Sequence, residues 1–406
     1  MFVTYTAVQT PSSENPSDLS NVTLTMEALN LNSGQVEWSA RPMILSNVWL
    51  YWTEVLVGPT FALLVSTSAD PPRGALTVLA VNLSGGETLG TWEVPLPQWT
   101  AIPPSEEVGL SLGTLVIAYP PYLNNSASTS IEIEGIDALS GQTLWQNVTQ
   151  LWNDFGWGTG SVMEYGAGSR LVFAMNPGGS EYNGGKIVVV NGQSGAITLQ
   201  VNVSAPSSVM NGAVAGNAYY FLANSSNELR IDGVNLSTGG ETSPIGVSNV
   251  ADGALISALL YAAGTTLIVA SYSPSLSYTA YQADGVESWA MGFPNSPSCT
   301  PAPTWPAIGL CATLLSAPMP YGNGSSVLLS SVASGLVQGA SYHNVYRLVD
   351  LNNGKIEWSS EYTFTYGGFT LFSGPVPTIT VEEVIGTEII YTIQTPNGTT
   401  TACGTL

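Results

Sequence analysis

The residues of this chain that could carry out chemistry are few, and carboxylates are the commonest of them. Hydrolysis of a glycoside needs two carboxyl groups about 5 to 9.5 Å apart. The acidic groups that lie close together in the sequence are Glu106–Glu107, Glu132/Glu134/Asp137 and Glu382–Glu383. Adjacent residues of a strand point to opposite faces, so the two Glu–Glu pairs are poor catalytic pairs. Glu132 and Glu134 share a face of an outer strand, and we interpret all of these groups as solvated surface.

Residues for metal binding and thiol chemistry are also few, with one histidine and three cysteines in the sequence. The single histidine, His343, excludes zinc, copper and haem sites that need two or more imidazoles, so we expect no metal. Cys299 and Cys311 bracket a proline-rich segment whose ends a disulfide could close, for a stabilisation of roughly 3 kcal/mol. Cys403 is left over, and it could pair with another chain or with residues of a longer precursor.

The segment 151–166 combines aromatic and acidic residues in a connection between strands. Its members are Trp152, Asp154, Phe155, Trp157, Glu164 and Tyr165. Aromatic rings beside carboxylates suit stacking against sugar rings, which makes a carbohydrate-binding patch a hypothesis. The alternative is that these aromatic side chains fill the space between neighbouring sheets.

Nine N-x-[S/T] motifs indicate an exported protein with N-linked glycans. Most of them fall in or beside segments that connect strands, where a glycan would face water. The candidate acceptors are Asn21, Asn82, Asn124, Asn147, Asn202, Asn224, Asn235, Asn323 and Asn397. Chance occurrence in a chain rich in Asn, Ser and Thr is the alternative.

The charge of the chain excludes some classes of partner and indicates the pH of its surroundings. Its 406 residues hold 7 Lys and Arg, 28 Asp and Glu and one His, for a net charge of −21. So few cations cannot form a nucleic-acid interface or a polybasic patch for anionic lipid. Well below pH 4 the carboxylates are protonated and few positive charges remain to repel one another. The composition therefore fits an acidic habitat, with a neutral-pH secreted protein coated in sugar as the alternative.

Two segments bear on export. Residues 1–20 lack the basic start and apolar run of a signal peptide, so we expect a mature or trimmed chain outside the cell. The uncharged stretch 253–283 is long enough to span a bilayer, but its AAGTT sequence interrupts it. We predict two sheet strands there and no membrane span.

Two kinds of glycine turn alternate along the whole chain. The first follows a strand of alternating polarity and precedes a short strand that often ends in Trp; its glycines are Gly34, Gly85, Gly141, Gly195, Gly239, Gly285 and Gly354. The second joins two apolar strands; its glycines are Gly58, Gly113, Gly168, Gly216, Gly264, Gly324 and Gly386. Tight hairpins commonly need a positive φ, which glycine adopts without strain.

Four strands in each period of about 50 residues, without an amphipathic helix, predict an all-β protein of the β-propeller type. We expect the first two strands of a period to be the more apolar pair, and the last two to alternate. Pairing the strand near 381–385 with the N-terminal strands would close a ring of seven four-stranded antiparallel blades. Residues 387–406 could instead belong to an eighth blade or link to a lost C-terminal segment. We expect a single domain, 1–406.

The recurring x-x-L-[N/D]-x-x-[S/T/N]-G-x-x-x-W unit resembles the repeat of PQQ-like, quinoprotein-type propellers over nearly the whole chain. In that family the tryptophan that ends the outer strand docks between neighbouring blades. By this resemblance the docking residues are Trp38, Trp92, Trp145, Trp289 and Trp358, while Leu199 and Ile245 replace the ring in two blades.

The same resemblance suggests a quinone cofactor, but the residues argue against one. Such enzymes commonly stack the quinone on a disulfide between adjacent cysteines, and no two cysteines here are adjacent. A C-x-x-C-H motif for c-type haem is also absent from the sequence. We expect no cofactor.

The sparse charge, the many Ser, Thr, Asn and Tyr residues and the N-x-[S/T] motifs are similar to those of surface glycoproteins of thermoacidophilic archaea. We therefore expect a secreted or cell-surface glycoprotein with a binding, adhesion or structural role and no catalysis. Its partners would be N-linked glycans, envelope proteins or further copies in a filament, and a carbohydrate ligand. The alternatives are an extracellular, acid-active polysaccharide-degrading enzyme and a degenerate quinoprotein oxidoreductase.

Overall fold

The computed structural model describes residues 2–11, 20–29, 36–70, 73–96, 107–119, 130–150, 160–165, 169–175, 185–203, 207–225, 228–247, 258–272, 276–293, 299–300, 312–315, 319–321, 325–334, 341–365, 378–385, 388–395 and 398–405. Within these ranges every regular element is a β-strand, and all pairings are antiparallel. The all-β prediction is therefore confirmed.

The largest sheet joins the two ends of the chain. Its strands follow the order β30–β31–β32–β1–β2–β4–β5–β6–β7, and β3 also pairs with β2. The bounds are β30 (Thr378–Ile385), β31 (Glu388–Thr395), β32 (Gly398–Thr405), β1 (Phe2–Pro11), β2 (Ser20–Leu29), β3 (Val36–Ser39), β4 (Met43–Val57), β5 (Phe61–Asp70), β6 (Arg73–Asn82) and β7 (Thr88–Leu96). Strand β4 links two halves, because its first residues pair with β2 and its later residues pair with β5.

Four sheets have four strands each, connected in sequence order. The first two contain β8 (Glu107–Ser111), β9 (Thr114–Tyr119), β10 (Ser130–Asp137) and β11 (Thr143–Gln150), then β12 (Gly160–Tyr165), β13 (Arg170–Met175), β14 (Gly185–Asn191) and β15 (Ile197–Val203). The next two contain β16 (Ser207–Ala215), β17 (Ala218–Ser225), β18 (Glu228–Asn235) and β19 (Ile245–Gly246), then β20 (Ala258–Ala263), β21 (Thr266–Tyr272), β22 (Leu276–Gln282) and β23 (Glu287–Phe293).

The remaining sheet has six strands centred on β27 and β28. They are β24 (Cys299–Thr300), β25 (Ala312–Leu315), β26 (Met319–Tyr321), β27 (Ser326–Ser334), β28 (Ser341–Asp350) and β29 (Ile356–Thr365).

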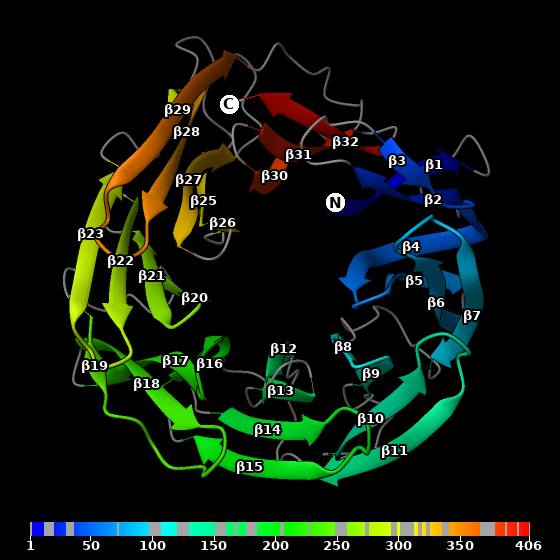
Figure 1. Cartoon of the computed structure of the whole chain (residues 1–406), viewed down its shortest axis with the longest axis horizontal. Coiled ribbons are helices and arrows are strands. Elements are labelled where there is room, and N and C mark those ends of the chain that lie inside the picture. The colour runs from blue at the N-terminus through cyan, green and yellow to red at the C-terminus, as the bar shows by residue number, and fades with distance from the viewer. Residues whose placement is uncertain are drawn as a thin grey trace.

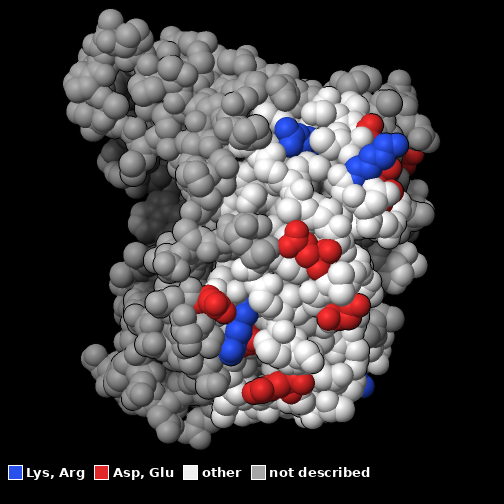
Figure 2. All heavy atoms as spheres, turned by 90° about the vertical axis from the view of Figure 1, so that its left-hand side faces the viewer, with Lys and Arg blue, Asp and Glu red and all other residues white. Residues whose placement is uncertain are grey.

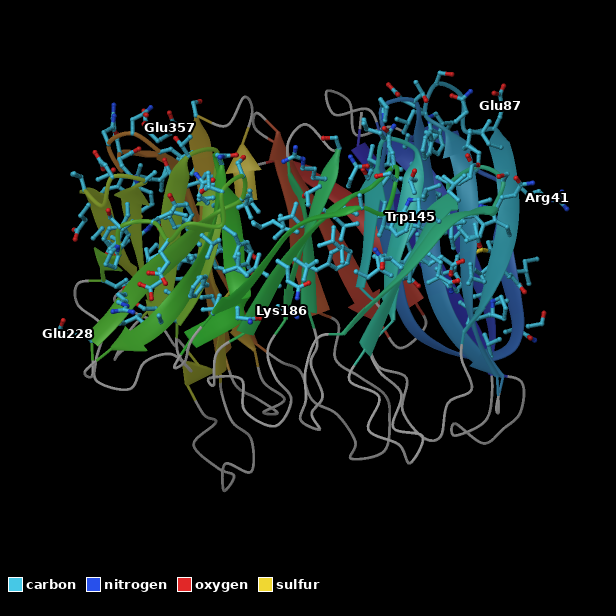
Figure 3. All side chains as sticks on the ribbon, turned by 90° about the horizontal axis from the view of Figure 1, so that it is seen from below. Arg41, Glu87, Trp145, Lys186, Glu228 and Glu357 are labelled. Carbon is cyan, nitrogen blue, oxygen red and sulfur yellow. The ribbon has the colours of Figure 1, made fainter. Side chains whose placement is uncertain are left out.

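The sheets stand around a common axis, as in a β-propeller (Figure 1). The first strand of each four-stranded sheet faces the axis and the last strand lies at the outer rim. Neighbouring inner strands approach one another in the series β4, β8, β12, β16 and β20. The short turns lie at one end of the assembly, where Figure 3 shows Glu87 and Glu357.

The core consists of separate apolar layers between neighbouring sheets. Leu63 and Val78 of one sheet, for example, pack against Leu115 and Ile136 of the next, and all four are fully or almost fully buried. Burial along β14 is continuous up to Val190, whereas β15 alternates between half-buried and exposed residues. We expected the third strand of each period to alternate, and for β14 this is wrong. The third strand β18 does alternate between buried and less buried residues from Glu228 to Asp232, whereas β14 is covered on both faces by the adjacent sheets.

Two predictions about strand placement have different outcomes. The stretch 253–283 contains β20 and β21, as predicted, and no helix in the described part of the chain is long and apolar enough to cross a membrane. The segment 381–385 lies in β30, but β32 is the strand that reaches β1, through Ala7 and Thr399. Residues 388–405 form a hairpin on β30, and this hairpin lies between β30 and β1.

Candidate functional site at the outer strands

The turn between the third and fourth strands has the same construction in sheet after sheet. Its first residue is an Asn or Asp whose side-chain oxygen accepts backbone N–H groups from residues further along the turn. The pairs are Asn82 with Ser84 (2.9 Å), Asp137 with Leu139 and Ser140 (3.2 and 2.7 Å), Asn191 with Gln193 and Ser194 (both 3.0 Å), Asn235 with Ser237 and Thr238 (2.9 and 3.0 Å), and Asp350 with Asn352 (2.7 Å). This arrangement is the Asx turn, which fixes the hairpin without a ligand.

A glycine with positive φ closes each of these five turns and also the turn between β22 and β23, which begins at Gln282. The values are 74° at Gly86, 71° at Gly141, 69° at Gly195, 74° at Gly239, 90° at Gly285 and 70° at Gly354. We expected Gly85 in the second turn, and this is wrong. Gly86 donates its N–H to the Asn82 carbonyl, as the fifth residue of the turn does in the neighbouring sheets.

The outer-strand tryptophans rest on the turn glycine of the following sheet. A Cβ built on the glycine would lie 2.4 to 2.7 Å from the ring, for Trp38 on Gly86, Trp92 on Gly141, Trp145 on Gly195 and Trp289 on Gly354. Each indole N–H also donates to a carbonyl of that turn: Leu83 (2.9 Å), Ala138 (3.3 Å), Gly192 (3.1 Å) and Leu351 (2.9 Å). Leu199 and Ile245 take the place of the ring over Gly239 and Gly285. The turn at 30–34, where we would place Trp358, lies outside the described residues.

Trp92 reaches its glycine from a shifted position. It pairs with Val78, four residues before the turn, whereas Trp145 pairs with Gly135, two residues before its turn. A β-bulge in every outer strand except the two-residue β19 adjusts this register. The shift follows from the spacing in the sequence, which is six residues from Gly86 to Trp92 and four from Gly141 to Trp145, whereas the bulge could not be read from the repeat.

Two of the glycan-acceptor motifs coincide with the Asx turns. Asn82 and Asn235 are the first residues of their turns, and Ser84 and Ser237 are the residues that complete both the turn and the motif. The equivalent position in other sheets is Asp137, Asn191 or Asp350. The turn alone therefore accounts for these two motifs.

Four further acceptors lie on strands. Asn21 on β2 and Asn202 on β15 are exposed, while Asn147 on β11 is half-buried and its Nδ2 donates to the Gly195 carbonyl at 3.1 Å. Asn224 lies on β17. Asn124, Asn323 and Asn397 fall outside the described residues.

The other predicted sites fall mostly outside the described residues. Of the aromatic segment, Glu164 and Tyr165 lie on β12, and Trp152, Asp154, Phe155 and Trp157 lie outside. Cys299 lies on β24 and Cys403 on β32, His343 lies on β28, and Cys311 lies outside. The acidic groups are spread over three strands: Glu107 on β8, Glu132, Glu134 and Asp137 on β10, and Glu382 and Glu383 on β30.

On the face that Figure 2 shows, scattered acidic and basic side chains lie on a background of other residues, and some of the two kinds adjoin. Arg230 and Asp232 form an ion pair on β18 at 2.8 Å. Arg347 lies 4.4 Å from the centre of the Phe293 ring and donates to the Gly292 carbonyl, which joins two sheets.

Four groups in the described part of the chain have a pKa shifted from its ordinary value, and one of them is Tyr220, whose pKa burial raises. Lys186 on β14 is only 4% exposed, and burial lowers its pKa. Burial raises the pKa of Tyr261 to about 12. The pKa of Asp137 lies below its ordinary value because the Ser140 hydroxyl and backbone N–H donate to the carboxylate. A buried lysine in a strand of apolar neighbours was not expected from the sequence.

The sequence matches no protein-family model and no curated protein. Among solved structures, the β-propeller domain of the Trilobed protease from Pyrococcus furiosus, described as having an open velcro topology, aligns with a TM-score of 0.47 at 10% identity, over 88% of this chain and 95% of that chain. The Dos1 propeller aligns with a TM-score of 0.45 at 11% identity, over 95% and 88%. A putative 6-phosphogluconolactonase from Bacteroides fragilis aligns with a TM-score of 0.46 at 10% identity, over 89% and 96%.

Proposed function

We propose that this chain is a secreted or cell-surface, N-glycosylated β-propeller with a binding, adhesion or structural role in a cell envelope or filament. The observation that supports the proposal best is the chemistry of one outer strand, β15. Its exposed residues are Thr198, Gln200 and Asn202, all of them polar and uncharged, and the last is a glycan acceptor. Such a strand would draw its solubility from hydroxyls, amides and attached sugar rather than from charge.

We further propose that the ring has seven blades of the PQQ-like type. Dividing the ten-stranded sheet within β4 turns six sheets into seven, with the terminal strands sharing one blade. The stacking of indole on glycine between sheets supports the PQQ-like assignment. An eighth, incomplete blade made of β30 to β32 is the alternative.

The location can be tested by brief protease treatment of intact cells that produce the protein. Peptides from outer strands should be released while a cytoplasmic marker protein stays intact. Recovery of these peptides only after lysis would contradict a surface location. Release into the medium without protease would identify the secreted form.

An extracellular polysaccharide hydrolase is the second candidate. Glu107 and Glu164 lie on β8 and β12, which are neighbouring inner strands. If the chain is a hydrolase, Glu164→Gln should abolish the release of reducing sugar from polysaccharide at acidic pH, and Glu287→Gln on the outer strand β23 should leave it unchanged.

A further inference from the structure

Within the described part of the chain, the outermost strand of each sheet presents a row of backbone N–H and C=O groups that no further strand of the sheet pairs. Such edges can pair with a second copy of the chain, and proteins commonly block them with charge, proline or a very short strand. The described outer strands are β3, β7, β11, β15, β19, β23 and β29. Their sequences can therefore be compared for these features.

Five of the seven outer strands carry a feature of this kind. Charge is present as Glu37 on β3, Glu93 on β7, Glu287 on β23, and Glu357 and Glu361 on β29. Pro95 adds a second block to β7, and β19 is only two residues long.

Strands β11 and β15 have none of these features. Their sequences are TLWQNVTQ and ITLQVNV, eight and seven residues without a charge or a proline. Each contains a β-bulge, but the bulge is common to the outer strands and does not set these two apart. Leu144 at the bulge of β11 is 51% exposed, so this uncharged edge also carries an exposed apolar side chain. The two strands are neighbours on the outer rim (Figure 1).

These two strands are also the ones among the seven that carry a glycan acceptor, Asn147 on β11 and Asn202 on β15. The other acceptors within the described ranges lie on β2, on β17 and in Asx turns. Asn202 is exposed. The Asn147 amide donates to the Gly195 carbonyl of the turn that leads into β15, and a sugar on its nitrogen would leave one N–H for this bond.

We propose that N-linked glycans on Asn147 and Asn202 cover the outer edges of β11 and β15 and prevent these strands from pairing with the same strands of a second copy. The glycans take the place that glutamate, proline or a short strand takes on the other outer strands. The inference rests on the proposed N-glycosylation and adds a role for two particular sites.

The test uses the whole chain, secreted from a host that attaches N-linked glycans. Peptide mass spectrometry first establishes the occupancy of both sites, and light scattering then gives the molar mass in solution. The wild type and the control Asn21→Gln should be monomeric. Asn147→Gln/Asn202→Gln should show a roughly twofold or larger rise in molar mass, as expected for pairing between copies.

Two further arms separate edge pairing from misfolding. Adding Gln146→Lys and Gln200→Lys to the double variant restores charge to both edges, and the monomer should return, because lysine blocks an edge without any sugar. If the double variant does not fold, an endoglycosidase applied to the folded wild type should produce the same rise in molar mass.

The possible failures are distinguishable. Unmodified Asn147 and Asn202 in the wild type would overturn the proposed glycosylation at these sites together with the inference. Occupied sites whose removal leaves the molar mass unchanged would overturn the inference alone. A rise in molar mass that the two lysines do not reverse would also overturn it.

Discussion

Replacing Gly195 by alanine should destabilise the protein far more than the same change at Gly216. Both glycines have positive φ, 69° and 58°. An alanine at either site carries the left-handed backbone penalty of about 1 to 2 kcal/mol. The sites differ in their surroundings, because a Cβ at Gly195 would lie 2.4 Å from Trp145 Cε3, whereas nothing lies within 4 Å of one at Gly216.

The additional cost at Gly195 follows from the displaced indole. Forcing extra volume into a packed contact costs about 1 to 3 kcal/mol, and losing the Trp145 hydrogen bond to Gly192 adds about 1 kcal/mol. We therefore expect a loss of about 3 to 6 kcal/mol for Gly195→Ala and about 1 to 2 kcal/mol for Gly216→Ala. Urea unfolding followed by tryptophan fluorescence and circular dichroism measures both.

The same glycine substitution can also be made in a variant that lacks the Trp145 ring. Trp145→Leu copies Leu199, whose Cδ1 would lie 3.0 Å from a Cβ on its own turn glycine, Gly239. In that background Gly195→Ala should cost less than it does in the wild type, because the ring that clashes is gone. Equal losses for Gly195→Ala and Gly216→Ala, or no coupling between Trp145→Leu and Gly195→Ala, would refute the docking role of the tryptophan.

Two further predictions follow from the turn and from the surface charges. The hydrogen bonds from Ser140 lower the pKa of Asp137 in the folded protein below its ordinary value of 3.8. The ionised carboxylate therefore stabilises the fold at pH values above 3.8, and this stabilisation is lost as the pH falls through the lower pKa of the folded state. Asp137→Asn should therefore lose less stability than the wild type between pH 5 and about pH 2 in thermal melts, and an equal loss would contradict the assignment. Arg347→Met should lower the free energy of unfolding by about 1 to 2 kcal/mol through loss of the Phe293 and Gly292 contacts, while Arg41→Met, on an exposed residue, should have little effect in the same assay.

The sequence predicted the strands well because the repeat is strong. Glycine turns, apolar pairs and terminal tryptophans recur at a constant spacing, and Trp145 and Gly195 could be matched from them before the structure was known. Placement of the strands in the ring was less predictable. The pairing of β32 with β1 depends on a C-terminal hairpin, and in the sequence its strands look like those of any other hairpin.

For the acceptor asparagines, too, the sequence predicted one part of their role and the structure was needed for the other. Their motifs are visible in the sequence, and the repeat places Asn82 and Asn235 at its [N/D] position, but the side-chain hydrogen bonds that make them structural turn residues are not. The distinction requires the hydrogen bonds of the Asx turn, which the equivalent Asp137 makes without any glycan motif. Burial of Lys186 likewise depends on the sheet that covers β14, and local sequence does not specify this contact.

Site-resolved peptide mass spectrometry of the protein from the cells that make it is the most direct test of the proposal of an exported, glycosylated propeller. We predict a sugar mass on Asn21, Asn147 and Asn202, the acceptors that lie on strands β2, β11 and β15. Asn82 and Asn235 could be unmodified without affecting the proposal, since their turns account for them. Unmodified asparagine at Asn21, Asn147 and Asn202 alike would contradict it.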